Sequence, residues 1–233
     1  MILLEVIATC IDDARQAEEN GADRLELITA VTEGGLTPGI GLVRQVVRSV
    51  RIPVHVMVRP HSRSFVYDGR DLETVTEEIR AIADAGAAGI VFGAITADGR
   101  IDERALEAVL PLAAGMQVTF HRAFDELDDL PAGLRTLLGY PGVTRILTSG
   151  GMNPAPEAIP AIRGLVEASK SSSLRILAGN GLKPEGIESF IERTGVTEVH
   201  FGSAVRLGRS GLAPIDPERL RALSDCLHRY GKS

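Results

Sequence analysis

The sequence is most informative at Val118-Thr119-Phe120-His121-Arg122-Ala123-Phe124-Asp125, where an apolar strand pattern runs directly into polar residues. Side chains alternate across a strand, so Val118 and Phe120 share one face while Thr119 and His121 share the other. In a parallel (β/α) barrel, the apolar face packs against outer helices. The other face points into the lumen and ends at the mouth, where active sites lie. This stretch therefore predicts a barrel strand.

The same unit of helix, glycine and strand recurs along the chain, at Gly21, Gly86, Gly142 and Gly195. Each glycine suits a left-handed helix stop before a short loop. Strands are expected near 3–8, 24–28, 54–58, 89–92, 117–121, 145–148, 175–178 and 198–201. Helices are expected near 11–20, 40–50, 71–85, 102–114, 130–138, 157–169, 184–194 and 217–230.

Eight such alternations in 233 residues predict an α/β protein, a single closed (β/α)8 TIM barrel that forms one domain over residues 1–233. An open doubly wound sheet is the alternative. Its first turn would ideally carry G-x-G-x-x-G, and the turn after the first predicted strand lacks that motif.

Composition narrows the function classes. The net charge of −6 argues against an electrostatic footprint for nucleic acid or an anionic membrane. Cys10 and Cys226 are too far apart in sequence to suggest a disulfide framework or a zinc knuckle, so a reducing compartment fits. The N-terminus lacks a signal-peptide pattern, and no apolar run reaches the length of a membrane span. We expect a cytoplasmic protein whose partners are small molecules, with no nucleic acid and no membrane.

Polar residues interrupt several predicted strands at inward-facing positions; Glu5, for example, lies between Leu4 and Val6. Burying such groups is costly unless they pair or serve a ligand. Their concentration favours a functional site, and the alternative is a structural network in which Glu5 and Glu26 neutralise Arg59. The inward candidates are Glu5, Glu26, His55, Arg59, His121 and His200. His55 stands at the beginning of a strand and is expected to be deep and structural.

The candidate mouth cluster is Glu5, Glu26, Arg59 and His121, with Arg122, Asp125 and His200 secondary. In an enzyme, His121 would transfer protons, Glu5 or Glu26 would be its partner, and Arg59 and Arg122 would clamp negative charge. Arg122 has the wrong parity for the lumen unless the strand ends by residue 121. These roles suit a small anionic or phosphorylated metabolite bound at the C-terminal mouth of the barrel.

Two glycine-containing loops follow the seventh and eighth predicted strands, where many barrels bind phosphate with backbone amides. Turn formation alone is the alternative explanation for these glycines. The predicted anion-binding residues are Gly179, Asn180, Gly181, Gly202 and Ser203.

Nearly the whole chain resembles the CutC family of copper homeostasis proteins. The motifs that carry the resemblance are Leu4-Glu5, the run from Asn20 to Leu27, Glu33-Gly34-Gly35-Leu36-Thr37-Pro38, Pro53-Val54-His55 with Arg59-Pro60, Thr119 to Asp125, and Leu147-Thr148-Ser149-Gly150. The resemblance implies a cytosolic TIM barrel, usually a homo-oligomer, that is linked to copper homeostasis and to binding of copper(I).

One departure from the family concerns the copper ligands. Relatives that look able to bind copper carry cysteines at the ends of the first two strands, where this chain has Ile7, Ala8 and Ile28. Because Cu(I) prefers thiolate and thioether ligands, Cys10 is the only thiol candidate near the mouth. Met57 on the lumen face and Met152 in a loop are further sulfur atoms. The two hypotheses are therefore a copper-handling protein and a barrel enzyme that acts on an anionic metabolite.

Overall fold

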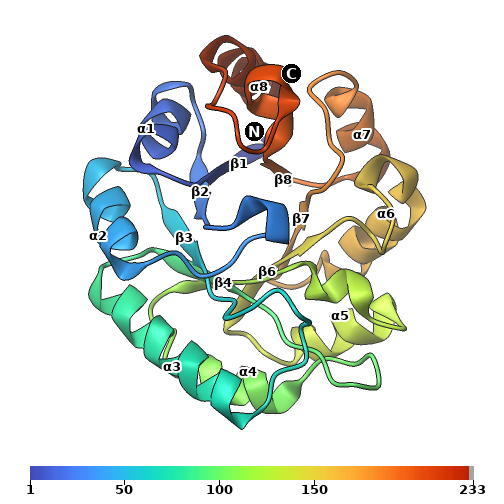
Figure 1. The fold of residues 1–233 in the computed structure, drawn as a ribbon. Helices are drawn as coiled ribbons and strands as arrows, with labels where there is room; N and C mark the ends of the chain where they lie inside the picture. Colours follow the sequence, from blue (N-terminus) through green and yellow to red (C-terminus); the bar gives the residue numbers. More distant parts are fainter. Residues whose placement is uncertain (231–233) are drawn as a thin grey trace.

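The computed structural model describes residues 1–230, which form a closed barrel of eight parallel strands paired in chain order. In Figure 1 the strands lie at the centre and the α-helices, α1 to α8, surround them. The predicted closed (β/α)8 fold is thus confirmed. The strands are β1 Leu3–Ala8, β2 Arg24–Leu27, β3 Val54–Met57, β4 Gly89–Phe92, β5 Gln117–Phe120, β6 Val143–Thr148, β7 Arg175–Ala178 and β8 Glu198–Phe201.

Several of the helices begin at side-chain caps that the sequence supplies. Asp102, Asp129 and Asp216 each accept a hydrogen bond from the backbone N–H three residues later, which satisfies a free donor of the first turn. The α-helices are α1 Ile11–Glu19, α2 Ile40–Ser49, α3 Gly69–Asp84, α4 Glu103–Val109, α5 Leu130–Leu138, α6 Ile159–Ser169, α7 Ile187–Thr194 and α8 Pro217–Arg229. Short 3-10 helices are η1 Val31–Glu33, η2 Arg122–Glu126, η3 Ala155–Glu157, η4 Ser203–Val205 and η5 Leu207–Arg209.

Several element boundaries differ from the sequence-based prediction. Helix α7 begins at Ile187 rather than near 184. Gly186 at its N-cap has a φ of 88°, which is not a helical conformation, so the helix does not extend further toward residue 184. Helix α4 ends at Val109 rather than near 114, and tight turns lead from there to Gly115, which has a φ of 88°. Strand β5 ends at Phe120, one residue earlier than expected, because His121 already caps the helix η2.

The apolar core lies mainly between the strands and the helices. Outward-facing strand residues such as Leu4, Val6 and Phe120 are fully buried there. A separate small cluster of Ile28, Met57 and Val91 lies apart from this core, with Ile7 packed against it. Since Ile28, Met57 and Val91 share the parity of the inward-facing residues, this cluster fills the upper lumen.

The segment after β2 folds over the centre of the barrel, where Figure 1 shows it in blue with its short helix η1. Two backbone hydrogen bonds between Thr29 and Leu36 close this segment at its base. Gly34 and Gly35 have φ values of 83° and 94°, which glycine adopts without steric cost. The segment therefore covers part of the barrel mouth in a fixed conformation.

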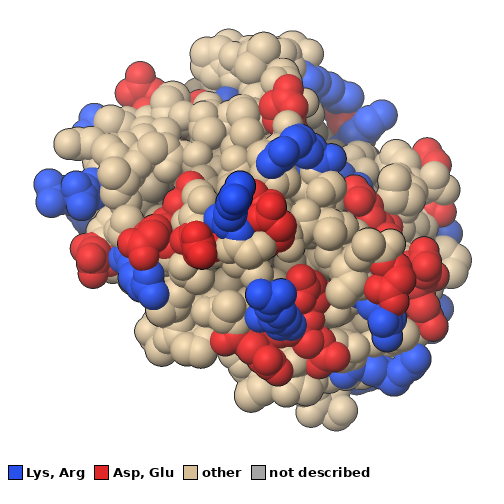
Figure 2. All heavy atoms as spheres, turned by 60° about the horizontal axis from the view of Figure 1, so that its bottom comes forward, with Lys and Arg blue, Asp and Glu red and all other residues tan. Residues whose placement is uncertain are grey.

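Acidic and basic side chains are interspersed on the face shown in Figure 2, and neither sign gathers there into one large field. Within residues 1–230, no helix combines the length and the apolar character needed to cross a membrane.

Candidate functional site

Ionised side chains fill the lower half of the barrel lumen. Glu5 of β1 accepts a hydrogen bond from Arg24 Nε of β2, and Arg24 Nη2 lies 2.7 Å from Glu198 Oε2 of β8. Arg145 of β6 reaches the same Glu198 oxygen at 3.1 Å. The strand register places Glu5 beside both Arg24 and His200. These groups form one network that joins four strands.

This network corrects one alternative drawn from the sequence. Glu5 is paired with Arg24 rather than with Arg59, which instead donates to the carbonyl oxygens of Glu33 and Gly35. Sequence reasoning missed Arg24, Arg145 and Glu198. Two of them carried a usable signal, because Arg24 and Glu198 lie two residues before Glu26 and His200 and so share their inward face.

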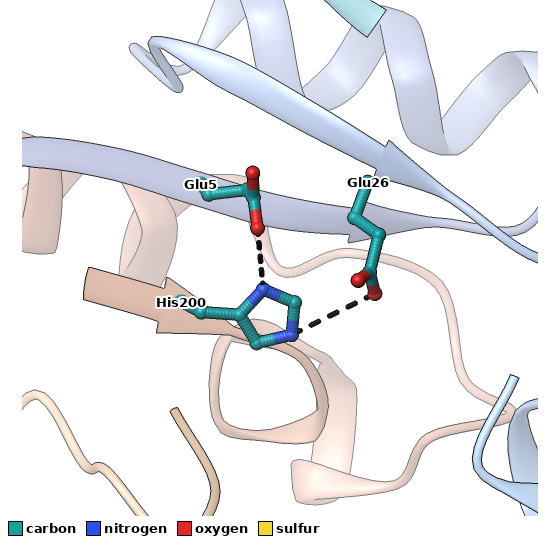
Figure 3. A group of neighbouring side chains, drawn as sticks. All are labelled: Glu5, Glu26 and His200. Carbon is teal, nitrogen blue, oxygen red and sulfur yellow. Dashed lines mark hydrogen bonds and ion pairs between the residues drawn. The ribbon is translucent and has the colours of Figure 1, made fainter. Parts of the chain in front are cut away.

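Glu5 of this network forms a compact group with Glu26 and His200 (Figure 3). The imidazole of His200 lies between the two carboxylates: Nδ1 is 2.8 Å from Glu5 Oε1 and Nε2 is 3.8 Å from Glu26 Oε2. Ligand atoms of all three lie within 4.8 Å of one another. Glu26 Oε1 is buried and has no hydrogen-bond partner within residues 1–230. This geometry is typical of a group that could hold a cation.

The two carboxyl groups differ in protonation. Burial raises the pKa of Glu26 to about 7. Burial acts in the same direction on Glu5, but the charge of Arg24 and the bond to His200 outweigh it, so the pKa of Glu5 lies well below its ordinary value. Burial lowers the pKa of His200, yet the two glutamates outweigh burial and raise it. Glu5 is thus ionised, whereas the pKa values of both Glu26 and His200 are displaced toward the protonated form.

A cavity of about 870 Å³ opens at the C-terminal ends of the strands. It brings together most of the residues that the sequence singled out. Glu5 does not line it, and the fully buried His55 also lies outside its lining, as expected for a deep residue. The singled-out residues that line the cavity are Glu26, Arg59, His121, Arg122, Asp125, Asn180, Gly181, His200, Gly202 and Ser203.

His121 is a hydrogen-bond donor in this cavity. Its Nδ1 accepts the backbone N–H of Ala123 at 3.1 Å, so the ring hydrogen lies on Nε2. Burial, assisted by the charge of Arg59, lowers the pKa of His121 to about 3. The ring is neutral, and its one free nitrogen already carries a hydrogen. In this form Nε2 can donate a hydrogen bond but cannot accept a proton, and the proton-transfer role of His121 stays a prediction.

Arg59 and Arg122 bring positive charge to the same side of the cavity. The Arg59 guanidinium carbon lies 4.4 Å from the centre of the Phe65 ring, and Phe65 lies 4.8 Å from the His121 ring, centre to centre. Because β5 ends before residue 121, the condition set for Arg122 is met and its side chain reaches the cavity.

Asp125 holds Arg122 and the loop after β6 in place. Its carboxylate accepts hydrogen bonds from Arg122 Nε at 2.8 Å, from Thr148 Oγ1, from Ser149 and from the Gly151 backbone. With its oxygens so fully used, Asp125 is a positioning residue.

The two glycine loops differ in the hydrogen bonds of their amides. The Gly179 amide donates to the Thr148 carbonyl at 3.0 Å and Gly179 does not line the cavity, so this amide is not free for the anion binding that the sequence predicts. The amides of Gly181, Gly202 and Ser203 have no acceptor among the residues described.

Comparisons with known proteins place this geometry in a family. The family model described as the CutC family matches residues 2–205. The chain belongs to the CutC family. The human copper homeostasis protein cutC homolog is 40% identical over 198 residues, which cover 85% of this chain and 72% of that protein. A family protein CutC of Rhizobium meliloti is 40% identical over 227 residues, which cover 94% and 91% of the two chains.

Solved structures agree with this assignment to the CutC family. The crystal structure of CutC from Streptococcus agalactiae has a TM-score of 0.80 and 32% identity, and the match covers 86% of this chain and 98% of that one. Phosphoribosyl anthranilate isomerase from Thermococcus kodakaraensis has a TM-score of 0.62 at 16% identity, over 99% and 100% of the two chains. The second likeness shows the barrel fold alone.

The thiol expected from the CutC resemblance lies outside the cavity. Cys10 is exposed, and its sulfur caps helix α1 by accepting the backbone N–H of Asp13 at 3.4 Å. It does not line the cavity, so the structure does not support Cys10 as a ligand at the mouth. Two thioethers do line it: Met57, which is 4% exposed, and Met152, which is 73% exposed.

Proposed function

We propose that this chain takes part in copper homeostasis by binding a copper(I) ion at the mouth of the barrel, between Glu26 and His200. The choice of copper as the metal rests on the names of its CutC relatives. The observation that carries the proposal is the carboxyl group of Glu26, whose buried Oε1 has no hydrogen-bond partner within residues 1–230 and whose Oε2 lies 3.8 Å from His200 Nε2.

The net charge of the buried groups in the lumen favours the binding of a singly charged cation. Three buried carboxylates, Glu5, Glu26 and Glu198, face two buried guanidinium groups, Arg24 and Arg145. Three negative charges and two positive charges leave one negative charge, which is costly in a buried site. A proton on Glu26 or His200 balances it near neutral pH, and Cu(I) would balance it equally when that proton leaves.

The donor atoms also suit copper. Imidazole nitrogen is an accepted copper ligand, and thioether sulfur is a soft ligand that favours Cu(I). His200 offers Nε2 and Met57 offers its sulfur in the same cavity, while Glu26 adds an oxygen. Without a thiolate, we expect weaker affinity than in a site with two cysteines.

An anaerobic Cu(I) titration against a competing chelator tests this proposal. We expect one ion per chain, with affinity reduced tenfold or more in Glu26→Gln and in His200→Asn. The asparagine can still donate to Glu5 but lacks the second ring nitrogen. Cys10→Ser is the matched control and should bind normally. Loss of binding in Cys10→Ser alone, or no saturable binding in the unmodified protein, would overturn the proposal.

The cellular setting belongs to the same proposal. We propose a cytoplasmic protein that works as a homo-oligomer, as the family resemblance implies. Light scattering of the purified chain measures the assembly, and a monomeric mass would remove that part.

A further inference from the structure

Two buried donors in the mouth cavity have no acceptor among residues 1–230: Nε of Arg59 and Nε2 of His121. Both residues line the cavity, and both are more than nine-tenths buried, at 7% and 3% exposure. Leaving a buried N–H without an acceptor costs free energy, so such groups in native proteins call for a specific explanation. A ligand that supplies the acceptor is one.

The surrounding residues fix both donors in place. Arg59 Nη1 donates to Glu33 at 2.9 Å, which anchors the guanidinium to the segment over the mouth. The Nδ1 bond to Ala123 keeps the hydrogen of His121 on Nε2. Phe65 packs against both groups, so neither can turn away without losing that contact.

The charges around these donors favour an anion. Arg59 and Arg122 are cationic, and His121 is neutral. Two buried acidic residues line the cavity: Asp125 is already bonded to Arg122 and to the loop after β6, and burial raises the pKa of Glu26 to about 7, which favours its neutral form. The cavity's other acidic side chains on this side, Glu33 and Glu126, are exposed at its rim.

We propose that Arg59, His121 and Arg122 form a subsite for the oxyanion of a small organic molecule, a carboxylate or a phosphate group. Guanidinium groups recognise both kinds of oxyanion through charge-assisted hydrogen bonds. The cavity has the volume of a small-molecule site, and the apolar side chains of Ile28 and Met57 in it suit the carbon skeleton of such a ligand. This inference goes beyond copper binding, and none of its three oxyanion-binding residues, Arg59, His121 and Arg122, is a proposed copper ligand.

Calorimetric titration of the metal-free protein tests the subsite, with inorganic phosphate and succinate as separate probes. We expect saturable binding of at least one probe at millimolar concentration or below. Which probe binds more tightly identifies the source of the oxyanion. His121→Asn should weaken binding about tenfold, because the side-chain oxygen still accepts the Ala123 N–H while the Nε2 donor is lost.

Arg63→Gln is the control for charge alone, since Arg63 is an exposed cation outside the cavity lining. It should bind the probe as the unmodified protein does. If His121→Asn fails to fold, Arg122→Gln serves instead and should also weaken binding about tenfold. Equal losses in Arg63→Gln, or no saturable binding of either probe, would overturn the subsite. Copper titration plays no part in this result, so the two proposals fail separately.

Discussion

His200 Nδ1 lies 2.8 Å from Glu5 Oε1, and this contact links the buried ion network to the open cavity. Glu5 is fully buried and ionised, so it orients the ring and leaves Nε2 facing Glu26. Metal-binding histidines commonly have such a carboxylate on the second nitrogen, which sets ring orientation and raises basicity. Glu5 therefore acts on the cavity through His200.

Replacing Glu5 with glutamine should strongly destabilise the fold. The change leaves Arg24 with Glu198 as its remaining ionised partner, and removing one partner of a buried ion pair costs up to about 3–5 kcal/mol. Urea denaturation measures the loss. Asp98→Asn, which breaks the exposed pair with Arg100, is the control and should change stability little. Similar midpoints for Glu5→Gln and the unmodified protein would contradict the network's structural role.

The raised pKa of Glu26 predicts a pH dependence. With a pKa of about 7 in the folded protein and 4.5 as the ordinary value, the folded state holds a proton that the unfolded chain releases. The stabilisation is complete below pH 4.5 and is lost as the pH rises through 7, by on the order of 3 kcal/mol. Glu26→Gln keeps the neutral form, so the variant should gain stability relative to the unmodified protein over this interval. A constant difference from pH 4 to 8 would contradict the assignment.

The lowered pKa of His121 predicts that folding stability decreases as the pH falls, the opposite of the trend expected from Glu26. The folded protein keeps the ring neutral down to about pH 3, whereas the unfolded chain takes up a proton below 6.5. Stability is therefore complete above pH 6.5 and falls as the pH drops, by about 1.4 kcal/mol per unit. His121→Asn should be less sensitive to acid, as measured by the unfolding free energy from pH 7 to 4.5. Parallel curves for the two proteins would rule this out.

Gly93 next to His121 should tolerate no side chain. A Cβ there would lie 2.6 Å from His121 Nδ1 and 2.8 Å from the neighbouring ring carbon. Gly93→Ala should cost about 1–3 kcal/mol, typical of an overpacked core, and should weaken anion binding by displacing the ring. Gly41→Ala is the control, because Gly41 lies in helix α2 with open space around it and alanine should stabilise it by about 0.5–1 kcal/mol. Normal stability and anion binding in Gly93→Ala would show that the ring can move freely.

We also propose that the loops after β7 and β8 bind phosphate through backbone amides. Phosphate should shift the amide resonances of Gly181, Gly202 and Ser203 in an NMR titration, because these amides lack an acceptor in the described chain. The Gly179 amide is the internal control and should not respond, since it donates to Thr148. Shifts confined to exposed loops elsewhere would refute the proposal.

The barrel could be predicted because its signals are local. Alternation of polar and apolar residues and a glycine after several helices are properties of short segments, and they placed each strand within two residues. Helix ends were less certain where turns continue a helix-like pattern, as after Val109.

The partners within the site could not be predicted, because they depend on strand register and side-chain direction. The alternation of side chains along the strands placed Glu5, Glu26 and Arg59 in one lumen. It could not show that the partner of Glu5 would be Arg24 rather than Arg59. The tautomer of His121 depends on its cap to Ala123, a contact that exists only because β5 ends at Phe120.

The distance along the chain between partners of the ion network has a consequence for synthesis. Arg24 and Glu198 are separated by 174 residues, so a ribosome has made most of the protein before the second carboxylate of Arg24 exists. Until then Arg24 has only Glu5, and Arg145 has no carboxylate from the network at all. In the incomplete barrel, Arg24 and Arg145 must therefore remain hydrated. Water can leave the lumen around them only after strand β8, which carries Glu198, has been synthesised. We therefore expect the nascent chain to be most prone to aggregation or chaperone binding just before strand β8 has been synthesised.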